Sequence, residues 1–312
     1  MTQKERPLRF IRPSKLFDSI AGFAPKNSTT RGEFFLDMPY NKIDVEWNHM
    51  DQLHRPFIHD TYNDNIRIAL GRDFATSLTR WGKWPFLITV TDMRVGEGLF
   101  YQTLVLAGLF FIHNTISMTD IEDKGDGNTL RLKLEWIIHS HWLLKPLHAV
   151  LSTMFYKLNV RLQQEDAPVR GARCELRKKG YTFLSDPPDY YNSNQLTNNT
   201  VYPALPAGAS IDTGALPMGS RESVTIGNVN FIVQRKEETV RIWPAACPHE
   251  GGDLARGKLH DDCRLECPWH GLKFSAATLS ATQPAAEIYG FSYRLENGIV
   301  TIRNSGQQAV AA

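Results

Sequence analysis

Short runs with strand character dominate the second half of the chain. They are rich in β-branched and aromatic residues and lie at Ser223–Ile226, Asn230–Gln234, Thr239–Trp243, Tyr289–Leu295 and Ile299–Arg303. Turn-forming pairs, Gly227–Asn228 and Asn297–Gly298, separate two pairs of these runs. Such runs, joined by tight polar turns, are typical of antiparallel strands. The pattern therefore predicts a small all-β domain in this half.

The first half carries longer apolar runs and one long helical pattern. Strands are predicted at Phe86–Thr91, Leu99–Ile112, Ile116–Ile121 and Thr129–His139, with a hairpin turn at Asp126–Gly127. Residues Lys42–Trp47 read equally as a strand or as the start of a helix. An amphipathic helix is predicted over about Leu147–Gln164. Antiparallel strands followed by one long helix predict an α+β domain, similar to the helix-grip fold of Bet v1 and START proteins.

Between the two halves the periodicity disappears. Asp186–Asn194, Asn198–Thr200 and Pro203–Gly208 are dominated by turn formers, as expected for a linker. We therefore predict an α+β helix-grip domain at 1–185, a linker at 186–220, an all-β domain at 221–305 and a tail at 306–312.

Composition narrows the class of protein. A chain of 312 residues has room for about two domains, and its 42% hydrophobic and 22% charged content excludes a largely disordered protein. A net charge of +2 gives no sign of nucleic-acid binding. The apolar run Leu99–Ile112 is shorter than the roughly 20 residues that a membrane helix needs, and Trp142–Val160 contains charged residues. Met1–Arg12 lacks the apolar core of a signal peptide. We expect a cytoplasmic protein that binds neither membranes nor nucleic acid.

The strongest chemical signal is a pair of Cys and His motifs. Cys247 and His249 form C-x-H, and after seventeen residues Cys267 and His270 form C-x2-H. Thiolate and imidazole ligands suit either zinc or a [2Fe–2S] cluster. A zinc finger would keep its two Cys together and its two His together. Here each loop offers one of each, which favours two irons ligated from both loops.

These motifs resemble the Rieske family over the whole C-terminal domain. Gly251, Gly252 and Gly271 follow the ligand pairs, as tight loops around a cluster require. Rieske proteins of respiratory chains carry an extra disulfide, but the corresponding places here hold Gly252 and Trp269. Cys174 and Cys263 are then free thiols. The resemblance is thus to the oxygenase and ferredoxin type, which implies a potential toward the low end of about −150 to +300 mV.

A second motif, D-x2-H-x4-H, is formed by Asp51, His54 and His59. Alone it could be an ordinary surface His pair. Beside a Rieske motif it resembles the catalytic iron site of ring-hydroxylating Rieske oxygenases, and Asn48 fits that pattern as well. The resemblance implies that His54 and His59 bind a non-haem Fe(II) with positions left open for O2. It also implies that Asp51 bridges a Rieske His and an iron-ligating His without binding iron itself. His49 is expected on the surface or beside the iron ligands, not as a ligand.

By the same resemblance, the third iron ligand is a carboxylate on the last long helix of the catalytic domain. Asp166 is our choice and Glu165 the alternative. The remaining possibility is that both are solvated charges at a helix end, facing Arg161 and Arg170.

The order of the domains departs from the family, whose oxygenase subunits place the Rieske domain first. In that family electrons cross between subunits of a trimer, from one chain's cluster to the next chain's iron. The reversed order leaves open whether transfer here runs between subunits or within one chain.

The leading hypothesis is an O2-dependent mono- or dioxygenase that hydroxylates or demethylates an apolar or aromatic small molecule. The chain has no G-x-G-x-x-G nucleotide motif, so a separate reductase, with or without a ferredoxin, would deliver electrons from NAD(P)H. The resemblance implies a homotrimer. One alternative is a non-enzymatic electron carrier or redox sensor with a ligand-binding helix-grip domain. Another is a helix-grip cyclase or hydrolase with a structural cluster. Three irons per chain would indicate the oxygenase, and two would indicate the carrier.

Overall fold

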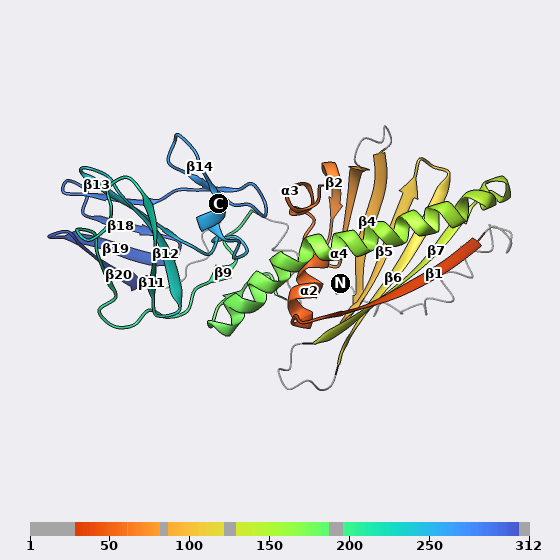
Figure 1. The fold of residues 1–312 in the computed structure, drawn as a ribbon, viewed down its shortest axis with the longest axis horizontal. Helices are drawn as coiled ribbons and strands as arrows, with labels where there is room; N and C mark the ends of the chain where they lie inside the picture. The colour runs from red at the N-terminus through yellow and green to blue at the C-terminus, as the bar shows by residue number, and fades with distance from the viewer. Residues whose placement is uncertain (1–28, 61, 82–86, 122–128, 187–195, 306–312) are drawn as a thin grey trace, which may run out of the picture. The chain divides into compact units, whose positions relative to one another are not determined.

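The computed structural model describes residues 29–305, except 61, 82–86, 122–128 and 187–195 (Figure 1). The chain divides into two compact units. The first takes residues up to Met38 together with Asn63–Leu162. The second takes Pro39–Tyr62 together with the residues from Gln163 onward. The long helix α4, His148–Lys178, contributes residues to both.

A seven-stranded sheet in the order β1-β7-β6-β5-β4-β3-β2 forms the first unit. Its strands are β1 (Thr29–Met38), β2 (Tyr62–Leu70), β3 (Phe74–Trp81), β4 (Leu87–Gly96), β5 (Leu99–Leu106), β6 (Phe110–Asp120) and β7 (Leu130–Ser140). The 3-10 helix η2 (Trp142–Leu147) leads into α4 (Figure 1).

Burial alternates along β7 with the period of two that a strand with one covered face requires. The buried series includes Leu134, Trp136 and Ile138. The indole of Trp136 donates to Ser152 Oγ of α4 at 3.0 Å and lies 5.6 Å from the Phe155 ring. The predicted sheet with a long helix against its inner face is thus confirmed.

The structure corrects several predicted elements of this unit. Leu99–Ile112 is not one strand, because Ala107 and Gly108 adopt φ of +51° and +68° and turn the chain between β5 and β6. The strands β1, β2 and β3 were missed, and the strand predicted at Ile116–Ile121 is the second part of β6. Helix α4 continues to Lys178, well past the predicted end. The turn predicted at Asp126–Gly127 lies outside the described residues.

Lys42–Trp47 proves to be helical, within α2 (Lys42–Met50), and the short helix α3 (Arg55–Ile58) follows. Both belong to the second unit.

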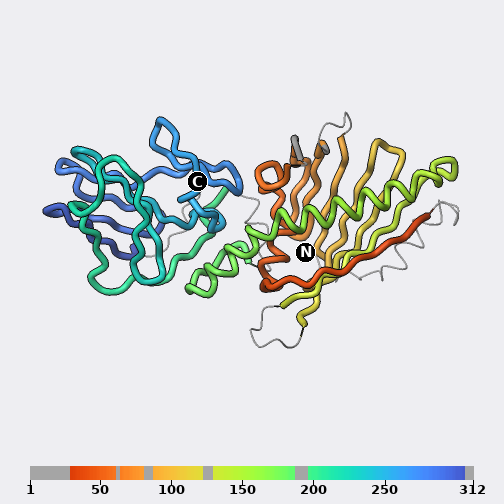
Figure 2. Tube along the Cα trace, viewed as in Figure 1, coloured from red at the N-terminus to blue at the C-terminus, as the bar shows by residue number. Residues whose placement is uncertain are grey.

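After α4, the second unit is built of β-strands and the 3-10 helix η4, as expected for the predicted all-β domain. Figure 2 traces this part of the chain from green to blue. One sheet has the order β11-β12-β13-β17 and another the order β10-β20-β19-β18. Phe231, Phe291 and Tyr293 are fully buried between them. The strands are β8 (Thr182–Phe183), β9 (Thr200–Val201), β10 (Ser210–Asp212), β11 (Arg221–Ile226), β12 (Val229–Arg235), β13 (Thr239–Pro244), β14 (Lys258–Leu259), β15 (Leu265–Glu266), β16 (Lys273–Phe274), β17 (Ala277–Ser280), β18 (Ala285–Ile288), β19 (Phe291–Glu296) and β20 (Ile299–Asn304), with the 3-10 helix η4 (Leu254–Arg256).

The boundaries differ from the predicted division at 186–220. Strand β9 pairs with β8, and β10 pairs with β20, so part of the predicted linker belongs to sheets. These strands are two and three residues long and are flanked by turn formers, which hides them from a pattern search. No described helix has an apolar stretch long enough to cross a membrane.

Candidate metal centres

Two loops of the second unit carry the predicted cluster ligands. Cys247 and His249 follow strand β13, and Cys267 and His270 follow β15. Each loop closes on itself in the same way. The Gly251 N–H donates to the Cys247 carbonyl and the Gly271 N–H to the Cys267 carbonyl, each at 2.9 Å. Both glycines have positive φ, +82° and +66°, which favours glycine there.

The four side chains converge in a buried place. The Nδ1 atoms of His249 and His270 lie 3.2 Å apart, and all four residues are buried. A hydrogen bond from the Cys247 thiol lowers the pKa of Cys267 to about 5, so a thiolate is favoured there. A Cβ on Gly252 would lie 2.7 Å from Cys267 Sγ, so only glycine leaves the sulfur its room. This donor set fits a [2Fe–2S] cluster.

The second group of candidate metal ligands lies just after α2, at the two ends of the short helix α3. His54 immediately precedes α3 and His59 immediately follows it. The Nε2 atoms of both histidines lie 3.3 Å from Oδ1 of Asp166, which α4 supplies. All three residues are buried, and one ligand atom from each lies within 4.8 Å of the others. Two imidazoles and a carboxylate in this arrangement could hold a metal.

Further side chains hold these groups in place. The guanidinium of Arg170 donates to Asp166 Oδ2 at 3.0 Å, and Asn48 Nδ2 donates to Oδ1 at 3.3 Å. Burial alone would raise the pKa of Asp166, but the Arg170 charge and the two imidazoles outweigh it, so the pKa lies well below its usual value. Glu165 contacts His59 Nδ1 at 2.9 Å and so lies on the side of that ring away from Asp166.

The structure therefore places Asp166 with the two histidines and Glu165 behind one of them. Neither is a solvated charge at a helix end, because α4 continues for twelve residues beyond Asp166. Burial, followed by the Arg170 charge, lowers the pKa of His49 to about 3. His49 thus lies near this group without joining it.

Asp51 lies between the two constellations, within the same unit. Its Oδ2 is 2.6 Å from His270 Nε2 and 3.6 Å from His54 Nδ1, the second distance being too long for a hydrogen bond. Its Oδ1 accepts the Leu53 N–H. Burial would raise the pKa of Asp51, but the charge of His270 and the hydrogen bond from it outweigh burial and lower the pKa. One fully buried carboxylate thus contacts a candidate ligand of each centre.

A buried ionic network, which sequence reasoning missed, adjoins the cluster loop. Arg173 of α4 is fully buried and ion-paired to Glu250, the neighbour of His249, at 2.5 Å and to Asp44 of α2 at 3.1 Å. Its guanidinium also lies 4.0 Å from the centroid of the Trp47 ring. Arg170, Arg173 and Arg177 recur at helical spacing, a signal that could have indicated one cationic face. The network ties α2 and α4 to the cluster loop.

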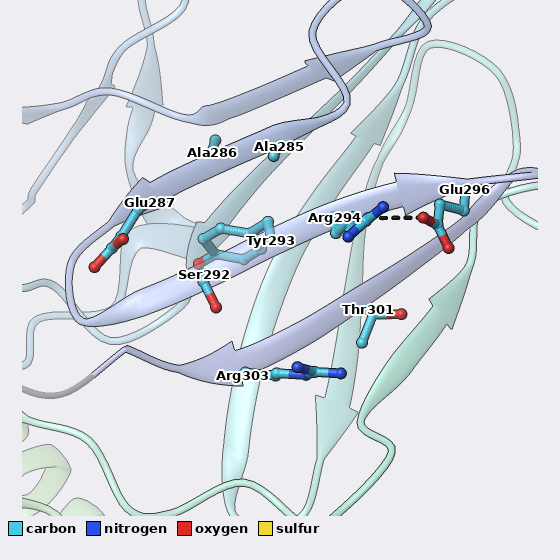
Figure 3. Close-up of a pocket in the computed structure, with 9 residues that line it drawn as sticks. All are labelled: Ala285, Ala286, Glu287, Ser292, Tyr293, Arg294, Glu296, Thr301 and Arg303. Carbon is cyan, nitrogen blue, oxygen red and sulfur yellow. Dashed lines mark ion pairs between the residues drawn. The ribbon is translucent and has the colours of Figure 1, made fainter.

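A pocket of about 570 Å³ opens over strands β18, β19 and β20 (Figure 3). Two of its lining charges, Arg294 and Glu296, pair with each other at 2.7 Å. None of its lining residues is a candidate metal ligand.

Comparison with known proteins identifies part of the chain. The Rieske [2Fe-2S] domain family matches residues 209–291, which include all four Cys and His ligands. The chain contains a Rieske domain. The match begins twelve residues before the predicted start at 221, and it includes strand β10.

Two curated relatives are cholesterol 7-desaturases. The protein from Ciona intestinalis is 31% identical over 114 residues, which cover 35% of this chain and 24% of the relative. The protein from Xenopus laevis is 37% identical over 90 residues, which cover 27% of this chain and 20% of the relative. The chain thus spans about a quarter of the length of these relatives, and the similarity to them is distant.

Similar solved structures correspond to less than half of the chain. Norcoclaurine synthase from Thalictrum flavum is 13% identical, with 45% of this chain and 86% of that chain covered and a TM-score of 0.36. The Zhui aromatase/cyclase from Streptomyces sp. R1128 is also 13% identical. The match covers 46% of this chain and 98% of that chain, with a TM-score of 0.35.

Proposed function

We propose that this protein is a Rieske non-haem iron oxygenase that hydroxylates or demethylates an apolar or aromatic small molecule. The observation that carries the proposal is the contact of Asp51 with His270 and His54. When bound, a [2Fe–2S] cluster supplies single electrons and a mononuclear Fe(II) activates O2. A carrier or sensor would need neither the buried group of His54, His59 and Asp166 nor its link to a cluster ligand.

Each residue of the iron site has a definite task in this proposal. His54, His59 and Asp166 would hold the metal, and the metal would supply the activation of O2. Glu165 accepts the Nδ1 proton of His59, which leaves Nε2 unprotonated for the metal. Arg170 and Asn48 donate to Asp166 and fix the direction of its carboxylate.

Asp51 performs the same task for the cluster. It accepts the Nε2 proton of His270, which leaves Nδ1 of that ring for the metal. The same carboxylate oxygen faces Nδ1 of His54. Because both contacts are made within one chain, we place the connection between the two centres inside a single subunit.

The remaining parts of the proposal concern partners and substrate. A separate reductase, with or without a ferredoxin, provides electrons from NAD(P)H, and the protein works in the cytoplasm as a homotrimer. The name of the curated relatives makes a sterol one candidate within the apolar substrate class. A desaturation would use the same O2-dependent chemistry.

Metal analysis of the purified protein, combined with product analysis under O2 and under argon, tests the proposal. We expect three irons per chain and a product that forms only with O2, a reductase and NAD(P)H. His54→Ala should lower the iron content to two per chain and keep the absorbance of the cluster. His141→Ala, at an exposed histidine outside the site, is the matched control. Two irons per chain in the unaltered protein would favour the carrier instead.

A further inference from the structure

A row of polar side chains crosses three strands of the sheet unit. Asp92 of β4 lies opposite Gln102 of β5, which lies opposite Asn114 of β6. The Gln102 amide donates to Asp92 Oδ1 and the Asn114 amide donates to Gln102 Oε1, both at 2.7 Å. Trp136 continues the row on β7 and donates to Ser152 of α4. The row therefore faces the helix.

Across β4, β5 and β6 the neighbouring positions on the same face are apolar apart from Arg94, and Ser77 of β3 lies opposite Val90. On one side stand Val90, Leu104 and Ile112, and on the other Phe100 and Ile116. All five of these apolar residues are buried. A row of three hydrogen-bonded polar groups in such surroundings is costly unless its atoms are paired.

The row has a fixed direction. A carboxylate accepts hydrogen bonds only, so Asp92 sets the Gln102 amide with its Nε2 toward the carboxylate. Gln102 then presents Oε1, which sets Nδ2 of Asn114 toward Gln102. Asn114 Oδ1 is left at the end of the row.

This last oxygen is a buried acceptor without a donor. Asn114 is fully buried, and its Oδ1 has no hydrogen-bond partner among the described residues. Buried acceptors in native proteins are almost always paired. The Trp136 ring lies over Gly32 of β1, where a Cβ would be 2.2 Å from it, and its N–H is already donated to Ser152.

We propose that Asn114 Oδ1 accepts a hydrogen bond from the hydroxyl group of an otherwise apolar molecule, an alcohol, bound against this face of the sheet. The row Asp92–Gln102–Asn114 acts as the selector of that hydroxyl. A ketone of the same shape would bring one acceptor against another and would bind more weakly. The proposed function is needed only to identify this alcohol as the substrate, and the binding itself does not depend on it.

Equilibrium dialysis of the holoprotein without a reductant tests the selection, because no turnover occurs under those conditions. The probes are alcohol and ketone pairs built on cyclohexane, decalin and androstane. We expect the unaltered protein to bind at least one alcohol about tenfold more tightly than its ketone, which corresponds to about 1.4 kcal/mol. Asn114→Leu keeps the volume and removes the acceptor, so the ratio should fall to about one.

Asp92→Asn provides a second variant. An amide at position 92 offers Gln102 either its oxygen or its N–H, so the direction of the row is no longer fixed and Asn114 can present either Oδ1 or Nδ2. The preference for the alcohol over the ketone should therefore fall. Thr76→Val, which removes the Thr76–Thr91 hydrogen bond elsewhere on the same sheet, is the control and should leave the ratio unchanged.

Three outcomes would overturn the proposal: equal affinity for alcohol and ketone in the unaltered protein, an unchanged ratio in both Asn114→Leu and Asp92→Asn, or no binding of any pair. In each case an ordered water is the partner of Asn114. Selective binding without any O2-dependent product would instead reject the proposed function alone. O2-dependent product without selective binding would reject this inference alone.

Discussion

Asp51 illustrates how much a single carboxylate can connect. Its Oδ1 is taken by the Leu53 N–H, so Oδ2 alone faces both imidazoles, His270 at 2.6 Å and His54 at 3.6 Å. The pKa of Asp51 is lowered even though it is fully buried, because its partners outweigh burial. A buried carboxylate of this kind costs free energy unless its contacts are made, and here those contacts lie on candidate ligands of two metal centres.

We expect Asp51→Asn to retain the cluster and the mononuclear iron, and to be reduced normally at the cluster. Product formation should fall by roughly 100-fold or more, because the amide loses the charge that holds both imidazoles. Iron analysis, the absorbance of the reduced cluster and product formation are measured together. Asp60→Asn, at an exposed carboxylate nearby, serves as the control. Full activity in Asp51→Asn would eliminate the bridging role.

The neighbouring carboxylates Asp166 and Glu165 should behave differently. Asp166→Ala should lose the mononuclear iron, because its Oδ1 is the atom shared by His54 and His59. Glu165→Gln should keep iron but bind it roughly 10-fold more weakly, since Gln cannot fix the His59 proton as firmly. Iron titration of both variants decides the assignment. Iron retained in Asp166→Ala and lost in Glu165→Gln would exchange the two roles.

At the scale of elements, a buried ionic network lies where α2, α4 and the cluster loop meet. Arg173 lies among Glu250, Asp44 and Ser185 with no exposed surface. A buried network of this kind gives little net stability over an apolar core, but the loss of one partner leaves charges stranded. It fixes the cluster loop to α2, which ends just before Asp51, and to α4, which carries Asp166.

Arg173→Met should therefore destabilise the second unit by about 3–5 kcal/mol, because the buried Glu250 loses its ion pair and the buried Asp44 keeps only the one with Arg177. Lys178→Met, which removes an exposed pair with Glu175, should change stability by less than about 1 kcal/mol. Urea unfolding followed by cluster absorbance and circular dichroism measures both. A further change of Glu250→Gln in the Arg173→Met background should restore part of the loss. Equal stability of the two single variants would show that the network contributes no more than a surface pair.

Periodicity predicted the strands whose neighbours are local. The runs at 223–226, 230–234 and 239–243 became β11, β12 and β13, because each is a hairpin neighbour of the next. Within Leu99–Ile112 the only turn signal is Gly108, a single glycine in an apolar run, while Ala107 carries no turn signature and still adopts positive φ. Strand β1 pairs with β7, about a hundred residues away, and a local sequence pattern cannot indicate so distant a partner.

The residues of the candidate site also differ in how far the sequence could predict them. His54 and His59 are brought together by the four-residue helix α3, so a short motif contains their geometry. Asp166 lies 107 positions beyond His59, and only the resemblance to a family pointed to it. Arg173 and Glu250 are 77 positions apart and carry no motif, so the fold alone brings them together.

At the scale of the whole molecule, the reversed domain order has a structural consequence. Asp51 and His270 are 219 positions apart and belong to the same compact unit. In the resembling oxygenases the corresponding link joins two subunits. Under the proposed function, this internal contact gives each chain its own route between the two centres.

Mixed assemblies provide the test of a single-chain route. His270→Ala removes a cluster ligand and His54→Ala removes an iron ligand, so co-expressed chains of the two variants contain one intact centre each. If the route lies within one chain, the mixture should form no product above the level of either variant alone, because no chain has both centres. Unaltered chains co-expressed with the double variant His54→Ala/His270→Ala are the matched control, and their activity should follow the fraction of unaltered chains. Iron analysis of the mixture verifies that both kinds of centre are present. Product from the mixture at a substantial fraction of the control would mean that electrons cross between subunits, and that the Asp51–His270 contact within one chain is not the route.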